Sequence, residues 1–360
     1  MVNIRNIKSN TKKTTIVVRA NGSMVLPFAL AILDVLKSEF LRLAQSRRIV
    51  LSVAKNLRNS RRERGGISME SIIEQFINGL RSGSIYALIA LGYTMVYGIA
   101  KMINFAHGDI IMVGAYALYV AIVLFNMPVI AAVLFTITVC AVLGVVIEKV
   151  AYKPLRKAPA LAVLITAIGM SILLQSIALL IFHSSPIAFK SIIKMESVSI
   201  GKITISGITM VTLLVTMVCM STLTLFINKT KAGSAMRAVS EDKAAAELMG
   251  INVNKTISMT FAIGSALAAV AGIMFVCQYQ SMEPTLGALP GIKAFVAAVL
   301  GGIGSVPGAM IGGILLGVIE SISKAYISSQ LSDAIVFGVL VLVLLVKPSG
   351  LLGKNSIEKV

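Results

Sequence analysis

Tryptophan is absent from this sequence, and charged residues are scarce. Charged side chains make up 13% of the 360 residues and hydrophobic ones 57%, whereas a typical soluble domain has about 25% charged residues. This deficit excludes a water-soluble surface over most of the chain. Apolar runs recur that reach the roughly 18–20 residues needed to cross a membrane core about 30 Å thick. The composition therefore predicts an all-α polytopic membrane protein, whose interfacial aromatic residues must be Tyr and Phe.

Cysteine and histidine are also rare, with three and two residues respectively. Cys140, Cys219 and Cys277 all lie in apolar segments, where their spacing suits neither a zinc site nor a disulfide framework. We interpret them as small buried hydrophobic residues. No metal site is predicted anywhere in the chain.

The net charge of +18 is concentrated at the N-terminus. Residues 1–68 hold 14 Lys and Arg against 3 Asp and Glu, a net of +11, which leaves +7 for the remaining 292 residues. We interpret the positive charge as loops beside an anionic membrane surface, not as a nucleic-acid interface. Residues 1–68 form a basic extension that we expect to be either disordered or an artefact of upstream translation. Its apolar stretch, 24–43, contains Asp34, and such a charge at a helix centre costs roughly 2.5–3.5 kcal/mol on insertion scales.

From residue 69 onward the hydropathy pattern predicts about eight transmembrane helices, some of them broken or re-entrant. They are expected at 80–100, 103–125, 127–148, 160–182, 207–227, 256–278, 292–319 and 329–346.

The hydrophilic loops between the helices predict their orientation in the membrane. Basic residues are enriched in 148–159 and 228–255, and the tail after Lys347 is also basic, so all three are expected on the cytoplasmic side. The loops 183–206 and 279–291 are then expected on the outer side of the membrane.

Two features indicate segments that do not cross straight. The segment 292–319 is long for one helix and is interrupted by "GGIGSVPGA". Three full crossings before residue 148 would place the basic N-terminus outside, against the charge rule. Non-helical backbone is tolerated at membrane depth only where it is buried or lines a cavity.

One polar stretch, "INFAHGDIIMVGAY" (103–116), interrupts the apolar sequence. On a straight helix Asp109 lies about 200° from His107, so one of them would face lipid unless protein surrounds the helix. Gly108 between them permits a break. We expect Asp109 either to cap a half-helix starting at Ile110 or to line a translocation path with Asn104 and His107. A catalytic His–Asp pair lacks a nucleophile motif, and a metal site lacks a third ligand.

The glycine-rich segment 301–317 predicts close helix packing. Gly304, Gly308 and Gly312 recur four residues apart on one helix face, a spacing that lets membrane helices approach; close contact with a solute is the alternative. The nearby "GLLGKNS" is not a phosphate-binding loop, because Pro348 occupies the first glycine position of that motif. The chain's own motifs therefore predict no nucleotide site and no bound cofactor.

The charged segment 228–255 predicts one short cytoplasmic helix. Ser240 can cap it, Glu241 and Asp242 suit its first turn, and Gly250 suits the position after its end. About nine residues give a length of roughly 14 Å. This helix is either a solvated loop helix or one that docks on a partner.

Five blocks of the sequence share one resemblance: "GLRSGSIYALIALGYTMVYGIAKMINFAHGDIIMVGAY" (79–116), "YKPLRKAPALAVLITAIGMSILLQ" (152–175), "MRAVSEDKAAAELMGINVNK" (236–255), "GIKAFVAAVLGGIGSVPGAMIGGILLGVIE" (291–320) and "KPSGLLGK" (347–354). Together they resemble the LivH family, the branched-chain amino-acid permeases of ABC importers. The resemblance covers a permease domain at 69–354 and leaves 1–68 and the short tail 355–360 without a counterpart.

In the importer loop pattern, Glu-Ala-Ala precedes a glycine. Here Ala244 replaces the Glu, whereas Ala245, Ala246 and Gly250 fit, and LivH-type loops commonly deviate at the first position. The resemblance thus implies that Arg237, Glu241, Asp242, Ala245, Ala246 and Gly250 lie at an ATPase contact.

The resemblance also implies a function and a set of partners. The chain would be a multi-pass permease of the bacterial plasma (inner) membrane and a transport subunit, not an enzyme. An external solute-binding protein would deliver branched-chain amino acids. Two cytoplasmic ATPase subunits would bind ATP and Mg, and a second related permease subunit would complete the path.

Three other functions remain open on the sequence alone. Importers of urea or short-chain amides have similar permeases. A secondary transporter or channel would need no ATPase, and its 236–255 helix would have no docking role. An intramembrane enzyme would use His107 and Asp109.

Overall fold

The computed structural model describes residues 69–156, 158–200 and 203–353. The expectations for residues 1–68 and for the tail 355–360 lie outside this described part. Helices dominate it, in the order α2 (Met69–Ala100), α3 (His107–Tyr119), η1 (Val120–Leu124), α4 (Val129–Ile147), η2 (Glu148–Tyr152), α5 (Ala160–Phe182), α6 (Gly207–Lys229), α7 (Lys231–Glu241), α8 (Lys243–Leu248), α9 (Val253–Tyr279), α10 (Ala288–Gly301), α11 (Val306–Tyr326) and α12 (Ser332–Val346). The elements η1 and η2 are single π-helical turns that prolong α3 and α4.

Within the described residues, seven helices are long and apolar enough to cross a membrane: α2, α3 with η1, α4 with η2, α5, α6, α9 and α11. The prediction of an all-α polytopic membrane protein is confirmed. The expected segment 292–319 is indeed broken, because α10 ends at Gly301 and α11 starts at Val306. With 14 and 15 residues, α10 and α12 are shorter than the roughly 20 residues of a full crossing.

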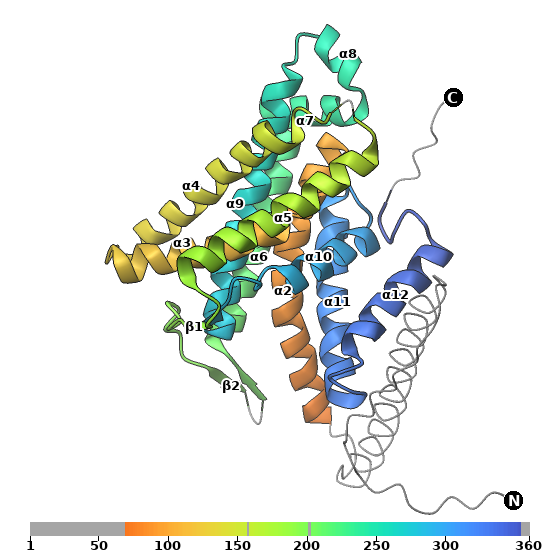
Figure 1. Cartoon of the computed structure of the whole chain (residues 1–360). Helices are drawn as coiled ribbons and strands as arrows, with labels where there is room; N and C mark the ends of the chain where they lie inside the picture. Colours follow the sequence, from red (N-terminus) through yellow and green to blue (C-terminus); the bar gives the residue numbers. More distant parts are fainter. Residues whose placement is uncertain (1–68, 157, 201–202, 354–360) are drawn as a thin grey trace, which may run out of the picture. The chain divides into compact units, whose positions relative to one another are not determined.

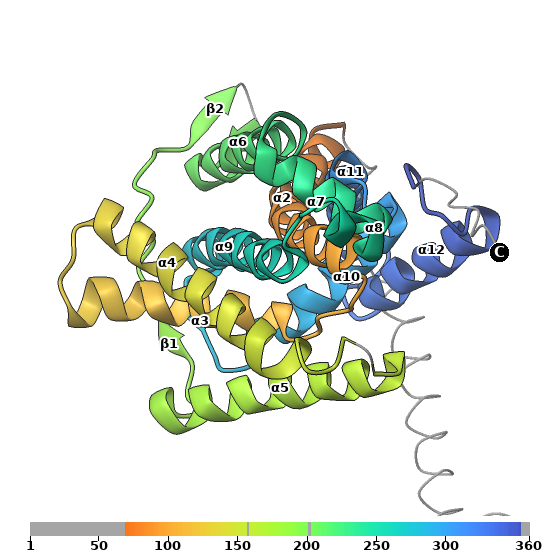
Figure 2. The same ribbon diagram turned by 90° about the horizontal axis from the view of Figure 1, so that it is seen from above.

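Helix α2 forms the centre of the bundle (Figures 1 and 2). Of its most apolar 18-residue window, 89% is buried inside the protein, against 72% for α9 and only 17% for α5 and α6. The outer helices α4, α5, α6 and α12 instead expose large apolar side chains such as Leu180 and Leu345. Because water would disfavour such surfaces, these helices face lipid or other apolar partners.

One end of the bundle, called here the α8 end, collects several chain segments. Lys243, the first residue of α8, contacts the last residue of α2, and Arg156 contacts Asn254 at the start of α9. The opposite end holds the start of α2, where Gln75 accepts a hydrogen bond from Ser321 near the end of α11. Two small antiparallel hairpins complete the described part, β1 (Ile187–Ala188) with β4 (Ser281–Met282) and β2 (Val198–Ile200) with β3 (Ile203–Ile205).

This arrangement bears on the expected topology. Helix α2 ends and α8 begins at the same end, so α2 starts at the other end. If the basic segment 228–255 is on the cytoplasmic side, as its charge predicts, Met69 would be on the outer side. The helices α2, α3 and α4 would then cross three times before residue 148. The charge rule disfavoured this number of crossings, because it places the basic N-terminus outside.

Glycines allow α11 to approach both α2 and α10. A Cβ atom on Gly313 would lie 2.5 Å from the Cα of Ala87 on α2, and Gly308 and Gly312 lie directly against the backbone of α10. The single face predicted for Gly304, Gly308 and Gly312 is wrong for Gly304. That residue precedes α11 in a turn with φ of +94°, a conformation that glycine adopts without strain.

Candidate functional site

The predicted polar break lies between α2 and α3, but not at Gly108. Helix α2 ends at Ala100, Lys101 has a positive φ of 57°, and α3 begins at His107. The expected half-helix starting at Ile110 is therefore wrong. Residue Asn104 holds the irregular segment in place: its backbone carbonyl accepts a 3.1 Å hydrogen bond from the His107 N–H, and its Oδ1 accepts a 2.8 Å bond from the Tyr152 hydroxyl.

Both His107 and Asp109 are buried, each with 1% of its surface exposed. Both are shielded because protein surrounds the helix: α3 is packed against α9, α4, α10 and α5. The His107 ring packs edge-on against Tyr93 of α2, with ring centroids 4.6 Å apart. The Asp109 carboxylate faces α5, where Gln175 Nε2 donates a 2.8 Å hydrogen bond to Oδ1.

Asp109 does not cap α3 with its side chain. The N-cap position is Ala106, which makes no side-chain cap, and Asp109 lies in the first turn, where the helix dipole stabilises a negative charge. Its hydrogen bond to Gln175 was not predicted. A glutamine within the apolar run of α5 was the available signal, since polar groups inside a membrane need partners.

The structure does not assemble a catalytic pair from these residues, since His107 contacts α2 and Asp109 contacts α5. No group of three His, Cys, Asp or Glu side chains in the described ranges could hold a metal ion. Gly108 serves close packing, because a Cβ there would lie 2.6 Å from the carbonyl oxygen of Gly287, immediately before α10.

A small cavity adjoins the break. Its wall is mostly aromatic and aliphatic, with one amide: Tyr93, Tyr97, Ile103, Asn104, Phe295, Ala298 and Ile303 line it. Among the described residues, the Nδ2 of Asn104 is buried without a hydrogen-bond partner. The break therefore places Asn104, whose Nδ2 has no hydrogen-bond partner, in the largely aromatic and aliphatic wall of a space between α2 and α10.

At the α8 end, the charged segment forms two helices where one was predicted. The carboxylate of Asp242 caps α8 by accepting hydrogen bonds from the N–H groups of Ala244 (2.8 Å) and Ala245 (3.1 Å). Ser240 is not the cap, because it lies within α7 and its hydroxyl donates to the Arg237 carbonyl. The expected stop at Gly250 agrees with its left-handed φ of +80° just after α8.

The exposure of these residues separates contact candidates from core residues. Of the six predicted docking residues, Arg237, Glu241, Asp242, Ala245 and Gly250 are exposed, whereas Ala246 is buried. Two residues that the sequence analysis missed, Leu248 and Met249, are 89% and 82% exposed. Large apolar side chains next to a helix-ending glycine, in an otherwise polar segment, were the signal.

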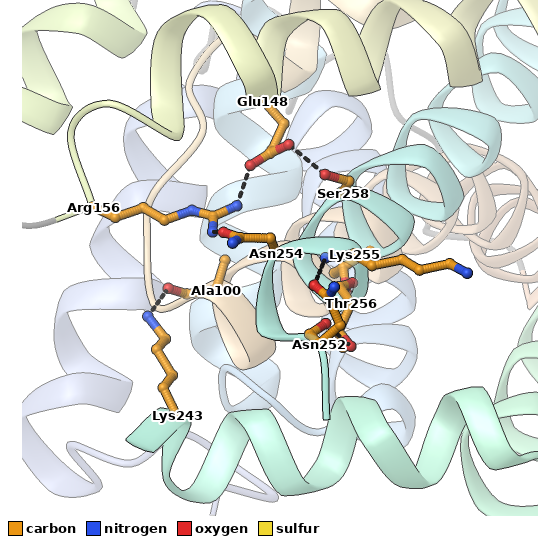
Figure 3. A network of polar contacts seen from close by, with 10 residues as sticks. Ala100, Glu148, Arg156, Lys243, Asn252, Asn254, Lys255, Thr256 and Ser258 are labelled. Atoms are coloured by element: carbon orange, nitrogen blue, oxygen red, sulfur yellow. Dashed lines mark hydrogen bonds and ion pairs between the residues drawn. The ribbon is translucent and has the colours of Figure 1, made fainter. Parts of the chain in front are cut away.

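Near Lys243, a network of polar contacts joins the end of α4, the segment before α5 and the start of α9 (Figure 3). Glu148, wholly buried at the end of α4, accepts hydrogen bonds from Ser258 of α9 (2.6 Å) and from Arg156. Arg156 also donates to Asn254. Beside this network, the Lys243 ammonium donates a 2.9 Å hydrogen bond to the carbonyl of Ala100.

Lys243 lies in an electropositive and partly buried environment. Burial, together with the positive charges of Arg156 and Lys101, lowers the pKa of Lys243 from its ordinary value. The ammonium is nevertheless placed at the C-terminal end of α2, where the free carbonyl groups favour a cation.

A second group of charges lies where α10, α11 and α12 meet. The Lys293 ammonium lies 2.8 Å from Glu320 and 2.7 Å from Asp333, and Lys324 lies 2.5 Å from Glu320. Lys293 and Glu320 are almost wholly buried. The sequence analysis did not single out these residues, although charges at the borders of apolar segments indicate paired or functional groups.

A bundle of helices able to cross a membrane, with a buried polar break and a pair of short helices at one end, is the architecture of a polytopic membrane protein. The sequence profile of a family described as "Branched-chain amino acid transport system / permease component" matches residues 75–344. The chain belongs to this family of permeases.

Similar curated proteins agree with the family. The chain is 47% identical over 300 residues to the high-affinity branched-chain amino acid transport system permease protein BraD of Pseudomonas aeruginosa, covering 80% of this chain and 98% of that protein. It is 44% identical over 301 residues to the permease protein LivH of Escherichia coli, covering 80% and 97%. The ribose import permease protein RbsC of Haemophilus influenzae is 28% identical over 258 residues, covering 69% and 77%. The chain is thus a multi-pass membrane permease and not itself an ATPase.

Proposed function

We propose that this chain forms part of the translocation path of an ABC importer for branched-chain amino acids. An external binding protein delivers the solute, and two ATPase subunits act from the α8 end. A second, related permease subunit completes the path. The observation that carries the proposal is the family match over residues 75–344, together with high identity to permeases of branched-chain amino-acid systems.

The polar break supports a path beside α2, α3 and α10. Leucine, isoleucine and valine combine an apolar side chain with a charged backbone group. The cavity at the break combines aromatic and aliphatic walls with the free amide of Asn104. Because an unpaired buried donor is costly, it is suited to a solute group that passes and forms a temporary hydrogen bond.

The α8 end supports ATPase docking. Leu248 and Met249 are largely exposed, and Ala245 beside them leaves room for a close approach. Exposed apolar side chains with polar surroundings mark interaction sites, and Met is enriched in protein interfaces. Asp242 fixes the helix by two cap bonds, so the tip is preorganised.

The docking proposal is tested by replacing Leu248 with Glu. A charge cannot be buried in an apolar pocket without a partner, so we expect the ATPase subunits to be lost from the purified complex. Leu225 on α6 is also exposed but lies within a membrane span, and Leu225→Met is a matched control that should retain them. ATPase retention by Leu248→Glu at the wild-type level would contradict docking at this tip.

A further inference from the structure

Beyond its docking tip, α8 contacts the membrane bundle through a hydrogen bond from a charged side chain. Lys243, its first residue, donates a 2.9 Å hydrogen bond to the carbonyl of Ala100, the last residue of α2 (Figure 3). Residues 143 positions apart in sequence are thus joined where the α8 end meets the central helix.

The chemistry of this contact is that of a helix C-terminal cap supplied from outside the helix. The last carbonyl groups of a helix lack intrahelical partners and carry a partial negative charge. Helix α2 has no basic residue in its last turn, and Lys101, which follows it with a left-handed φ of 57°, is exposed. The Lys243 ammonium donates directly to the last carbonyl of α2 and so places a cation there.

The position of this bond links α8 to the polar break. Ala100 is followed directly by the irregular segment that contains Asn104, whose side chain lines the cavity and binds the Tyr152 hydroxyl. Tyr152 ends η2, the turn that begins with Glu148. A displacement of α8 would therefore act on the end of α2 and on the segment after it, which contains Asn104.

We infer that Lys243 is a positioning residue that transmits movement of the docked helix α8 to the break between α2 and α3. The inference rests on the proposed function, because only an importer with ATPases at the α8 end would move this helix. The role differs from docking: Lys243 points toward the membrane bundle, whereas Leu248 and Met249 are exposed.

The test compares three variants of the full importer complex in proteoliposomes, with the external binding protein and radiolabelled leucine. Lys243→Met keeps the side-chain length and removes the charge. Lys243→Arg keeps a cationic donor. Lys255→Met removes an exposed lysine at the same end of the bundle, and the side chain of Lys255 points away from the network in Figure 3.

We expect Lys243→Met to assemble with the ATPases and hydrolyse ATP, but to import about tenfold less leucine per ATP, which corresponds to about 1.4 kcal/mol of coupling. Lys243→Arg should retain most of the wild-type ratio of leucine imported to ATP hydrolysed. Lys255→Met should have the same ratio as wild type. If Lys243→Met does not assemble, Lys243→Gln, which retains a polar tip without the charge, should show the same loss.

Two results would overturn the inference. A wild-type ratio of leucine to ATP in the uncharged variants would show that the bond does not couple. Loss of the ATPase subunits from both uncharged variants would assign Lys243 to docking instead. Failure of the proposed function differs from failure of the Lys243 inference, because the wild-type complex itself would then import no leucine with ATP.

Discussion

The seam between α2 and α11 gives a sharp test of how this bundle is held together. Helix association in a membrane depends on close packing, because lipid is as apolar as the side chains themselves. A Cβ on Gly313 would lie 2.5 Å from both the Cα and the backbone nitrogen of Ala87. The substitution Gly313→Ala therefore forces the two helices apart or bends one of them.

The magnitude follows from the contact distances. Carbon atoms pack best at about 3.5–4.0 Å, so the helices must separate by roughly 1 Å, and such a gap forfeits a quarter to a half of each nearby contact. Adding a methylene to a well-packed core costs typically 1–3 kcal/mol. We expect Gly313→Ala to lower the free energy of unfolding by about 2 kcal/mol, roughly a thirtyfold change in the folded-to-unfolded ratio.

The cysteines provide the assay. Intrinsic tryptophan fluorescence is absent, but Cys140 and Cys277 are wholly buried, so a thiol-reactive fluorogenic dye reports thermal unfolding. Gly338→Ala on α12 is the matched control, because a Cβ there meets nothing within 4 Å; its melting temperature should stay or rise slightly, since Ala favours helix over Gly. Equal melting temperatures for the two variants would refute the packing argument.

Two further predictions concern buried polar groups. Lys293→Met should destabilise the protein by about 3 kcal/mol, because Glu320 then stays buried with only part of its positive charge partners. Lys324→Met should cost less than about 1 kcal/mol, because the Lys324 side chain is half exposed. The same dye assay measures both variants, and equal losses of stability would contradict the role of burial. Asp109→Asn should retain leucine uptake, because an amide oxygen can still accept the hydrogen bond from Gln175, whereas Asp109→Leu strands that donor and should reduce folded protein or uptake; wild-type uptake and yield in Asp109→Leu would show that the bond is dispensable.

Hydropathy alone predicted most of the transmembrane helices. Segments such as 160–182 and 207–227 agree with α5 and α6 within a few residues, because an uninterrupted apolar run of that length has few alternatives in a membrane. The break of 292–319 was also predictable, since glycine and proline interrupt the helical pattern there.

The location of the polar break was not predictable from local sequence. Gly108 was the obvious candidate, but its neighbours continue the helix, and the chain reverses before His107 instead. The reason is tertiary: Asn104 binds Tyr152, 48 positions away, and no local pattern indicates that contact. The shielding of both His107 and Asp109 likewise depends on helices packed around α3.

In segment 228–255, two residues compete for the N-cap position of one helix. Ser240 and Asp242 both fit an N-cap position on sequence grounds. Asp242 is used because its carboxylate accepts two N–H bonds, while the Ser240 hydroxyl bonds back to the carbonyl of Arg237 within α7. Helix α8 therefore begins two residues later than a Ser240 cap predicts, at Lys243, and Ala246 in it is buried.

The central proposal is tested most directly by solute uptake in a defined system. The full chain is reconstituted in proteoliposomes with a second permease and ATPase subunits from the same genome, and radiolabelled leucine is supplied with the binding protein outside. We expect leucine to accumulate only with both enclosed ATP and the binding protein. We expect isoleucine and valine, but not urea, to inhibit this accumulation. Uptake driven by an ion gradient without ATP, or inhibited by urea or short amides and not by valine, would contradict it.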